Sequence, residues 1–119
     1  MALEPTQHVD AIAERVYETY RSDVLVPSIR RLGSEARAYL AAMAGLLDEG
    51  GVGVTSDVAA ALGKTTTQLS SCRQRLISRR LIRLDGYGKV RFALPYLSRF
   101  ASEKPADVER LAPGEWKIR

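Results

Sequence analysis

The chain has 119 residues, the length of a single domain, which leaves no room for a second, catalytic domain. No stretch approaches the roughly 20 consecutive apolar residues that a membrane-spanning helix needs, and residues 1–16 lack the pattern of a secretory signal, so we expect a cytoplasmic protein with no membrane partner. A single cysteine, Cys72, and a single histidine, His8, exclude an internal disulfide and are too few for a zinc site, so we expect no metal and no cofactor.

The first predicted element is an amphipathic helix over residues 9–20. Its apolar residues recur at intervals of three and four, the spacing of one helix face: Val9, Ile12, Ala13, Val16, Tyr17 and Tyr20. A second apolar group, in residues 24–32, is interrupted by Pro27, which lacks a backbone N–H and disfavours helix in the residue before it. We therefore expect a break near Val26 and a short helix from Pro27 to Leu32.

Helix-stop and helix-start residues then follow one another. Gly33 suits a helix end, and Ser34 can cap a helix that is predicted over residues 34–48. After a glycine-rich turn two further elements are expected: a short strand over residues 52–54 and, after the cap-forming residues 55–57, a short helix over residues 58–62 that Gly63 ends.

The next predicted helix covers residues 66–80. Thr65 and Gln68 match a capping box, in which each side chain satisfies the backbone amide of the other residue, so the helix should begin at Thr66. One side of this helix is apolar, with Leu69, Cys72, Leu76 and Ile77. The opposite side is polar, with Thr67, Ser71, Gln74 and Ser78, and Ser70 and Arg75 lie on the flanks.

The period of the apolar residues then changes to two, which predicts two strands over residues 82–84 and 90–94. The five residues between them are turn formers around an exposed aromatic residue, Tyr87, as in a hairpin loop. Beyond the hairpin we expect Pro95 to end the second strand, a short helix near residues 96–100, and an irregular tail over residues 103–119 that Val108, Leu111, Trp116 and Ile118 could anchor.

Positive charge is concentrated between Lys64 and Arg91. This segment holds eight basic residues and one acidic residue, Asp85, a net charge of +7, whereas the whole chain carries +4. The basic residues are Lys64, Arg73, Arg75, Arg79, Arg80, Arg83, Lys89 and Arg91. Because the opposing acids of an ordinary solvated helix face are missing, the segment favours a negatively charged partner.

The order of elements in residues 34–94 resembles that of a winged helix-turn-helix domain: a helix, a short helix, a tight turn, a second helix and a hairpin. More narrowly, the runs SEARAYLAAMA, TSDVAAALGKTTTQLSSCRQRLISRRLI and YGKVRFALPYLSRF resemble the C-terminal winged helix of AAA-type ATPases related to origin-recognition and loader proteins. The resemblance implies a mainly α fold with a small β-hairpin, with an added N-terminal helix. It divides the chain into a helical extension (1–33), the winged helix-turn-helix domain (34–101) and a C-terminal tail (102–119).

Two arginines depart from the winged-helix pattern. Arg73 stands where many winged helices have leucine, so we expect it to be partly buried against an acidic partner rather than on DNA. Arg80 stands at the end of the second helix, where glycine is usual because the left-handed backbone conformation favours it. The family also implies a nucleotide-binding domain that this chain does not contain.

No catalytic constellation is visible in the sequence. The run AALGKT matches the end of a phosphate-binding loop, but Val58 stands where the first glycine should be, and a helix precedes the run where a strand is required. Gly86 and Gly88 form only a fragment of a dinucleotide-binding fingerprint, which a hairpin loop explains better. We therefore expect that the chain is not an enzyme.

The basic segment predicts binding to double-stranded DNA, because clustered lysines and arginines release the counterions that surround a duplex. The basic residues beside the hairpin tip suit phosphate contacts, and Tyr87 could reach the minor groove. The polar helix side could enter the major groove, with base readout mainly by Gln74 and Arg75. The predicted interface consists of Lys64, Thr66, Thr67, Ser70, Ser71, Gln74, Arg75, Arg83, Tyr87, Lys89 and Arg91.

Alternatives remain open for the partner. Winged helices also contact other proteins, so the domain could be an interaction or lid module of an ATPase that does not bind DNA. Any single arginine could simply solvate an exposed face. The helix over residues 9–20 could pack on its own domain, which we favour, or self-associate with a second copy, or link to the missing ATPase domain.

Overall fold

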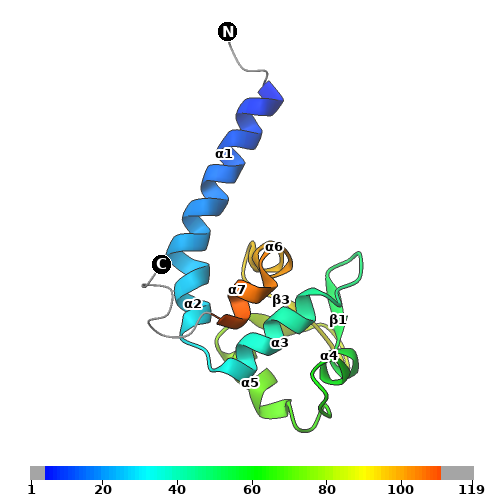
Figure 1. Cartoon of the computed structure of the whole chain (residues 1–119). Coiled ribbons are helices and arrows are strands. Elements are labelled where there is room, and N and C mark those ends of the chain that lie inside the picture. The colour runs from blue at the N-terminus through cyan, green and yellow to red at the C-terminus, as the bar shows by residue number, and fades with distance from the viewer. Residues whose placement is uncertain (1–4, 111–119) are drawn as a thin grey trace.

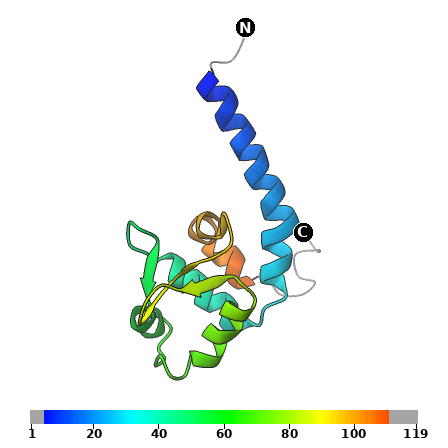
Figure 2. The same ribbon diagram turned by 180° about the vertical axis from the view of Figure 1, so that it is seen from behind.

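Helices form most of the described chain, and a small antiparallel sheet lies at one side of them (Figures 1 and 2). The computed structural model describes residues 5–110, with side chains for residues 11–108, so the side chain of His8 lies outside the described part. The elements in chain order are α1 (Pro5–Tyr20), the π-helix η1 (Arg21–Leu25), α2 (Val26–Arg30), α3 (Ser34–Ala44), β1 (Val52–Val54), α4 (Thr55–Ala61), α5 (Ser70–Ser78), β2 (Ile82–Leu84), β3 (Lys89–Phe92), α6 (Leu97–Glu103) and α7 (Pro105–Arg110). The predicted mainly helical fold with a small β-structure is confirmed. Between residues 5 and 110, no helix has the length and apolar character that crossing a membrane requires.

The first three elements form one continuous helical segment, of which α1 extends away from the rest of the chain (Figure 1). The break expected near Val26 is therefore wrong. The N–H of Val26 bonds to the carbonyl of Arg21, five residues earlier, as in a π-helix. A proline ring clashes with the carbonyl four residues before it, here that of Asp23, and the wider π-turn makes room for Pro27. The proline widens the helix without ending it.

The core is built around α3, against which α5, α6 and α7 pack. Tyr39, Leu40 and Met43 of this helix are fully buried. Leu25 of η1 and Ile29 of α2 are fully buried in the same cluster. The segment after α1 therefore contributes to the main core, while most of α1 itself does not.

The ends of α3 differ from the prediction. Gly33, and not Ser34, occupies the N-terminal cap position, and the helix ends at Ala44 instead of Asp48. The carboxylate of Asp48 accepts hydrogen bonds from the backbone N–H groups two and four residues later, both at 2.9 Å. Asp48 therefore organises the glycine-rich turn that leads into β1, because a short acidic side chain can satisfy turn amides that would otherwise lack partners.

The three strands have the order β1-β3-β2, with both pairs antiparallel. The strand predicted at residues 52–54 and the predicted hairpin are both confirmed. Side chains alternate along β3, so that Val90 is fully buried while Lys89 and Arg91 point to the opposite face. Arg83 of β2 lies directly opposite Arg91 in the register. The outer face of the sheet therefore carries all three basic residues of the hairpin.

Gly63 ends α4 as predicted. It has a positive φ of 68°, the left-handed conformation that favours glycine. The N–H groups of Gly63 and Lys64 bond to the carbonyls of Ala60 and Ala59 at 3.1 and 2.9 Å, which closes the helix end. The chain then turns sharply toward α5.

The capping box predicted between Thr65 and Gln68 is present. The N–H of Thr65 donates to Oε1 of Gln68 at 2.9 Å, and the N–H of Gln68 donates to Oγ1 of Thr65 at 3.1 Å. The predicted helix start at Thr66 is wrong, because the next turn is tighter: the N–H of Ser70 bonds to the carbonyl of Thr67, three residues earlier. Consecutive β-branched threonines have low helix propensity, and the regular helix begins at Ser70.

Helical structure extends further toward the C-terminus than predicted. The short helix expected after Pro95 is present as α6, but residues 105–110 form α7 where an irregular tail was expected. Pro105 begins α7, a position that proline favours because its N–H would have no helical partner there. Val108 is fully buried, as expected of an anchor. The other expected anchors, Leu111, Trp116 and Ile118, lie outside the described residues.

The turn after α5 is left-handed at Arg80, whose φ is 62°. The N–H of Arg80 bonds to the carbonyl of Ile77 at 2.9 Å, and the N–H of Leu81 bonds to the carbonyl of Leu76 at 3.0 Å. This pair of bonds is typical of helix ends that contain glycine. The arginine thus adopts the backbone conformation for which glycine is the usual residue, and α5 ends two residues before it.

Replacing Arg80 by glycine is expected to raise the free energy of unfolding by about 1 kcal/mol. A left-handed non-glycine residue costs roughly 1–2 kcal/mol, and the greater freedom of glycine in the unfolded chain offsets part of the gain. Urea denaturation followed by circular dichroism measures the change, and Gly63→Ala is the matched control, with an expected change of the opposite sign. A less stable Arg80→Gly variant would show that contacts of the arginine side chain outweigh its backbone strain.

Candidate nucleic-acid interface

The strands β2 and β3 and their loop form a unit that we call the basic hairpin, residues 82–92. The side chains of Arg83 and Lys89 are exposed on its outer face. Neither takes part in an ion pair with any side chain of residues 11–108. Both charges are therefore available to an anionic ligand.

Arg91 is held in place by the hairpin itself. Its guanidinium donates to the carboxylate of Asp85 at 3.4 Å and to the backbone carbonyl of Gly50 at 3.3 Å. Because like charges directly opposite each other in a sheet repel, Asp85 offsets the repulsion between Arg91 and Arg83. Arg91 therefore contributes to the positive field of the outer face but is less free to move than Arg83.

Tyr87 forms the tip of the basic hairpin, and its side chain is fully exposed. Gly86 and Gly88 on either side have positive φ values of 91° and 70°, so the loop needs residues without a Cβ there. The base of the loop is tied to the start of α4, because the N–H and the hydroxyl of Thr55 both donate to the carbonyl of Gly88, at 2.9 and 3.2 Å. The aromatic ring thus projects from an anchored loop.

The outward side of α5 carries Ser71, Gln74 and Arg75, which are all exposed. Cys72 and Leu76 on the other side are buried, which confirms the predicted division of this helix. Within the described side chains, the Gln74 amide and the Arg75 guanidinium have no hydrogen-bond partner. Both groups can therefore bond to an external ligand.

The remaining predicted residues lie in or next to the turn before α5. Thr67 is exposed and Thr66 is half-buried, while the hydroxyl of Ser70 donates to the carbonyl of Thr67 at 2.9 Å and is thus partly used within the turn. Nζ of Lys64 lies 2.5 Å from Oε2 of Glu35 in α3. An exposed ion pair of this kind is worth about 0–1 kcal/mol, so a phosphate could displace Glu35 from Lys64.

Arg73 does not belong to this surface. It is half-buried beside Tyr39, and the acidic partner expected for it is not found in the described part of the chain. Burial raises the pKa of the Tyr39 hydroxyl, and the neighbouring Arg73 charge opposes that rise. Burial likewise raises the pKa of the Cys72 thiol, so this cysteine stays protonated at neutral pH and is a poor nucleophile.

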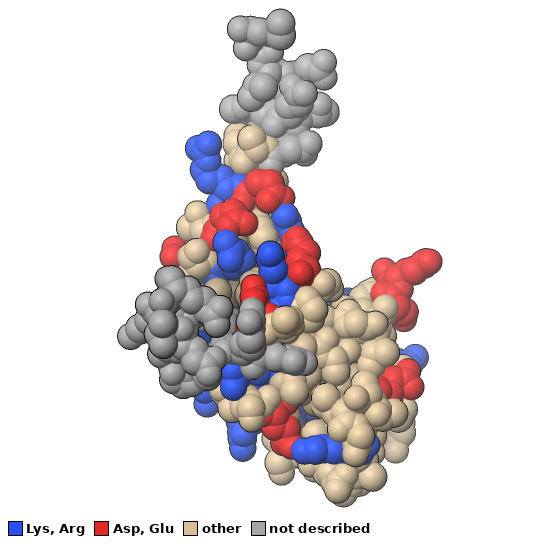
Figure 3. All heavy atoms as spheres, viewed as in Figure 1, with Lys and Arg blue, Asp and Glu red and all other residues tan. Residues whose placement is uncertain are grey.

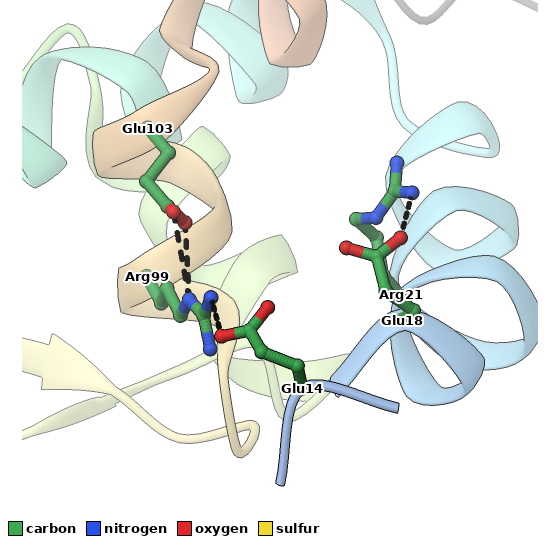
Figure 4. Close-up of polar contacts among 5 residues, drawn as sticks. All are labelled: Glu14, Glu18, Arg21, Arg99 and Glu103. Atoms are coloured by element: carbon green, nitrogen blue, oxygen red, sulfur yellow. Dashed lines mark hydrogen bonds and ion pairs between the residues drawn. The ribbon is translucent and has the colours of Figure 1, made fainter. Parts of the chain in front are cut away.

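A second charged cluster anchors α1 to α6 (Figure 4). The Arg99 guanidinium lies over the ring of Tyr17, 3.8 Å from its centroid, and forms ion pairs with Glu14 of α1 and Glu103 of α6. The Tyr17 ring is 3% exposed and meets the ring of Tyr96 edge-on, and its burial raises the pKa of its hydroxyl. The expected packing of α1 on its own domain therefore holds for this side of the helix. No spacing in the sequence indicates the contact between α1 and α6, because Arg99 lies 85 residues after Glu14.

A protein-family model described as "Domain of unknown function (DUF8462)" matches residues 22–101. The match covers more than half of the chain and runs from η1 to α6, so it includes α5 and the whole basic hairpin. The helix α1 precedes the matched residues. No curated protein matches the chain.

Proposed function

The chain belongs to the DUF8462 family, and we propose that it binds double-stranded DNA through a winged helix-turn-helix domain over residues 34–101. The order α3, β1, α4, tight turn, α5, β2 and β3 supports this, because it follows the element order of that fold. The glycine-containing turn between α4 and α5 and the outward position of the polar α5 side support it further. In this proposal α5 is the recognition helix and the basic hairpin is the wing.

The observation that carries the proposal is the outer face of the sheet. Arg83, Lys89 and Arg91 lie together on that face, with only Asp85 as an acidic residue in the hairpin. Each lysine or arginine that neutralises a phosphate releases condensed counterions, which favours binding entropically. The basic outer face of the hairpin suits contact with the phosphates of a duplex, and Tyr87 at the hairpin tip would lie along the minor groove.

The helix α5 would enter the major groove. An α-helix with its side chains is about 10–12 Å across, which fits the major-groove width of about 12 Å, and the nine residues of α5 are about 13 Å long. Glutamine can bond to adenine and arginine to guanine through paired hydrogen bonds, so Gln74 and Arg75 would read bases, with Ser71 beside them. Lys64, Thr66, Thr67 and Ser70 precede or begin α5 and would contact the phosphates at the groove edge.

The resemblance to the C-terminal domain of AAA-type ATPases extends the proposal. In such an arrangement ATP would be bound and hydrolysed by a domain outside residues 1–119, and this chain would supply the contact with DNA. The chain itself would have no catalytic role.

A protein-interaction module is the second candidate function. The hairpin region also exposes apolar side chains: Leu84 is 57% exposed, Val54 is 38% exposed, and Tyr87 is fully exposed. Exposed apolar side chains of this kind suit contact with another protein surface, such as a docking or lid contact within an ATPase.

Binding to a fluorescently labelled duplex of about 30 base pairs, at salt concentrations between about 50 and about 200 mM, tests the DNA-binding proposal. With about four phosphate contacts, the affinity is expected to fall about 100-fold over this range, because the logarithm of the binding constant falls by about 0.9 per contact for each tenfold rise in salt. Absence of binding at the lower salt concentration would contradict the proposal and leave the protein-interaction module.

A further inference from the structure

The outer side of α1 is an apolar surface without a partner among the described residues. Ile12 and Val16 are 48% and 50% exposed. They border a shallow groove of about 480 Å³ along α1 and η1, lined by Ile12, Arg15, Val16, Thr19, Tyr20, Asp23 and Val24. Exposed apolar side chains in a row along one helix are unfavourable in water, so we expect another molecular surface to cover them.

This exposure does not come from a detached helix. The other side of α1 is fixed to the body by Tyr17, which is buried against Tyr96 and covered by Arg99. Tyr20 also lies 5.5 Å from the ring of Tyr96, measured between centroids. The outer side is thus presented in a defined orientation, as a preformed docking surface.

The charges that border the groove identify the occupant. Figure 3 shows acidic and basic side chains close together around α1. Among the charged residues, Arg15 of α1 and Asp23 of η1 border the groove. They are eight residues apart, about 12 Å along a helix, with Thr19 midway between them. A second α1 that runs antiparallel, with the two-fold axis at Thr19, brings Arg15 of each copy opposite Asp23 of the other. A parallel pair would instead place identical charges opposite each other.

The apolar residues fit the same antiparallel arrangement. With the axis at Thr19, Val24 of the other copy faces position 14, and Ile12 is two residues, about 3 Å, from that position. In the same way Tyr20 of the other copy faces position 18, and Val16 is two residues from it. A two-fold contact is self-complementary by construction, so each contact occurs twice. We propose that the chain forms a homodimer through an antiparallel α1–α1 contact centred at Thr19, with reciprocal ion pairs between Arg15 and Asp23.

A charge-swap series tests this contact by analytical ultracentrifugation, without nucleic acid present. Arg15→Asp and Asp23→Arg each place like charges opposite each other at two symmetric positions, so each is expected to weaken dimerisation about 10-fold. The double variant Arg15→Asp/Asp23→Arg restores opposite charges and should dimerise within about threefold of the wild type. A monomeric wild-type chain, or a double variant as weak as the single variants, would overturn the proposal.

Cysteine cross-linking provides a second, independent readout of the register. Under mild oxidation Thr19→Cys should form a covalent dimer, because residue 19 meets its own copy at the axis, whereas the native Cys72 is buried. Ile12→Cys should not cross-link, because the two copies of residue 12 lie about 21 Å apart along the antiparallel pair. Circular dichroism establishes that each variant is folded. A parallel pair would bring residue 12 as well as residue 19 beside its own copy, so cross-linking of Ile12→Cys, or a failure of Thr19→Cys to cross-link, would overturn the proposal.

Discussion

Replacing Arg83, Lys89 and Arg91 together by alanine is expected to weaken duplex binding about 100-fold at about 100 mM salt and to reduce the salt slope by about 2.7. The three side chains share the outer face of the sheet, and each would neutralise one phosphate. Because phosphates carry no sequence information, the loss should be nearly uniform across duplexes of different sequence. Fluorescence anisotropy over a series of salt concentrations measures both quantities.

A charge-matched control removes the same net charge elsewhere. Arg21, Arg31 and Lys104 lie outside α5 and the basic hairpin, and their joint replacement by alanine should weaken binding only about threefold, through the lower net charge. Gln74→Ala on α5 should leave the salt slope unchanged but alter the preference among sequences, by roughly 1–3 kcal/mol at one base pair. If the hairpin variant bound as tightly as the wild type, the assignment of the hairpin as the wing would be wrong.

Tyr17→Ala is expected to lower the free energy of unfolding by about 2–4 kcal/mol. The ring is 3% exposed and lies between Tyr96 and the Arg99 guanidinium, so its removal leaves a cavity at the joint between α1 and α6. Removal of a large buried ring typically costs about 3–5 kcal/mol, and the position at the edge of the core reduces this somewhat. Urea denaturation followed by far-ultraviolet circular dichroism, at one fixed protein concentration, gives the change.

Tyr17→Phe is the matched variant, because it keeps the ring and removes only the hydroxyl. Its expected cost is below about 1 kcal/mol, since the edge-on contact with Tyr96 and the stacking of Arg99 depend on the ring. An unchanged free energy of unfolding for Tyr17→Ala would mean that α1 unfolds separately from the body. The anchoring cluster would then contribute nothing to global stability.

Local signals in the sequence account for much of the fold. The capping box of Thr65 and Gln68, the end of α4 at Gly63 and the alternation in residues 82–92 each depend on neighbours within a few positions, and the structure contains all three. The unusual helix end at Arg80 was visible for the same reason. Of the proposed site, the polar side of α5 and the basic face of the hairpin follow from helix and strand periodicity alone.

The parts that could not be predicted depend on contacts between distant residues. Lys64 forms an ion pair with Glu35, which lies 29 residues earlier and is not linked to it by any local spacing rule. The positive charge of Lys64 is therefore partly neutralised, which the sequence alone did not indicate. Residues 105–110 are polar enough to suggest an irregular tail, yet packing against α3 buries Val108 and stabilises α7. Pro27 predicts a disturbance of the helix. Whether that disturbance is a break or a π-turn depends on tertiary packing, because Leu25 and Ile29 on either side of Pro27 are both buried in the core.

The π-turn η1 also determines how α1 is rotated about its own axis relative to the rest of the protein. Each residue of a helix turns the chain by about 100° and advances it by about 1.5 Å, so the extra residue in Arg21–Leu25 determines which side of α1 meets the body. Deletion of one residue there would rotate Tyr17 away from Tyr96 and swing Ile12 and Val16 round by the same angle. The length of this segment is therefore constrained more tightly than the identity of an exposed member such as Ser22.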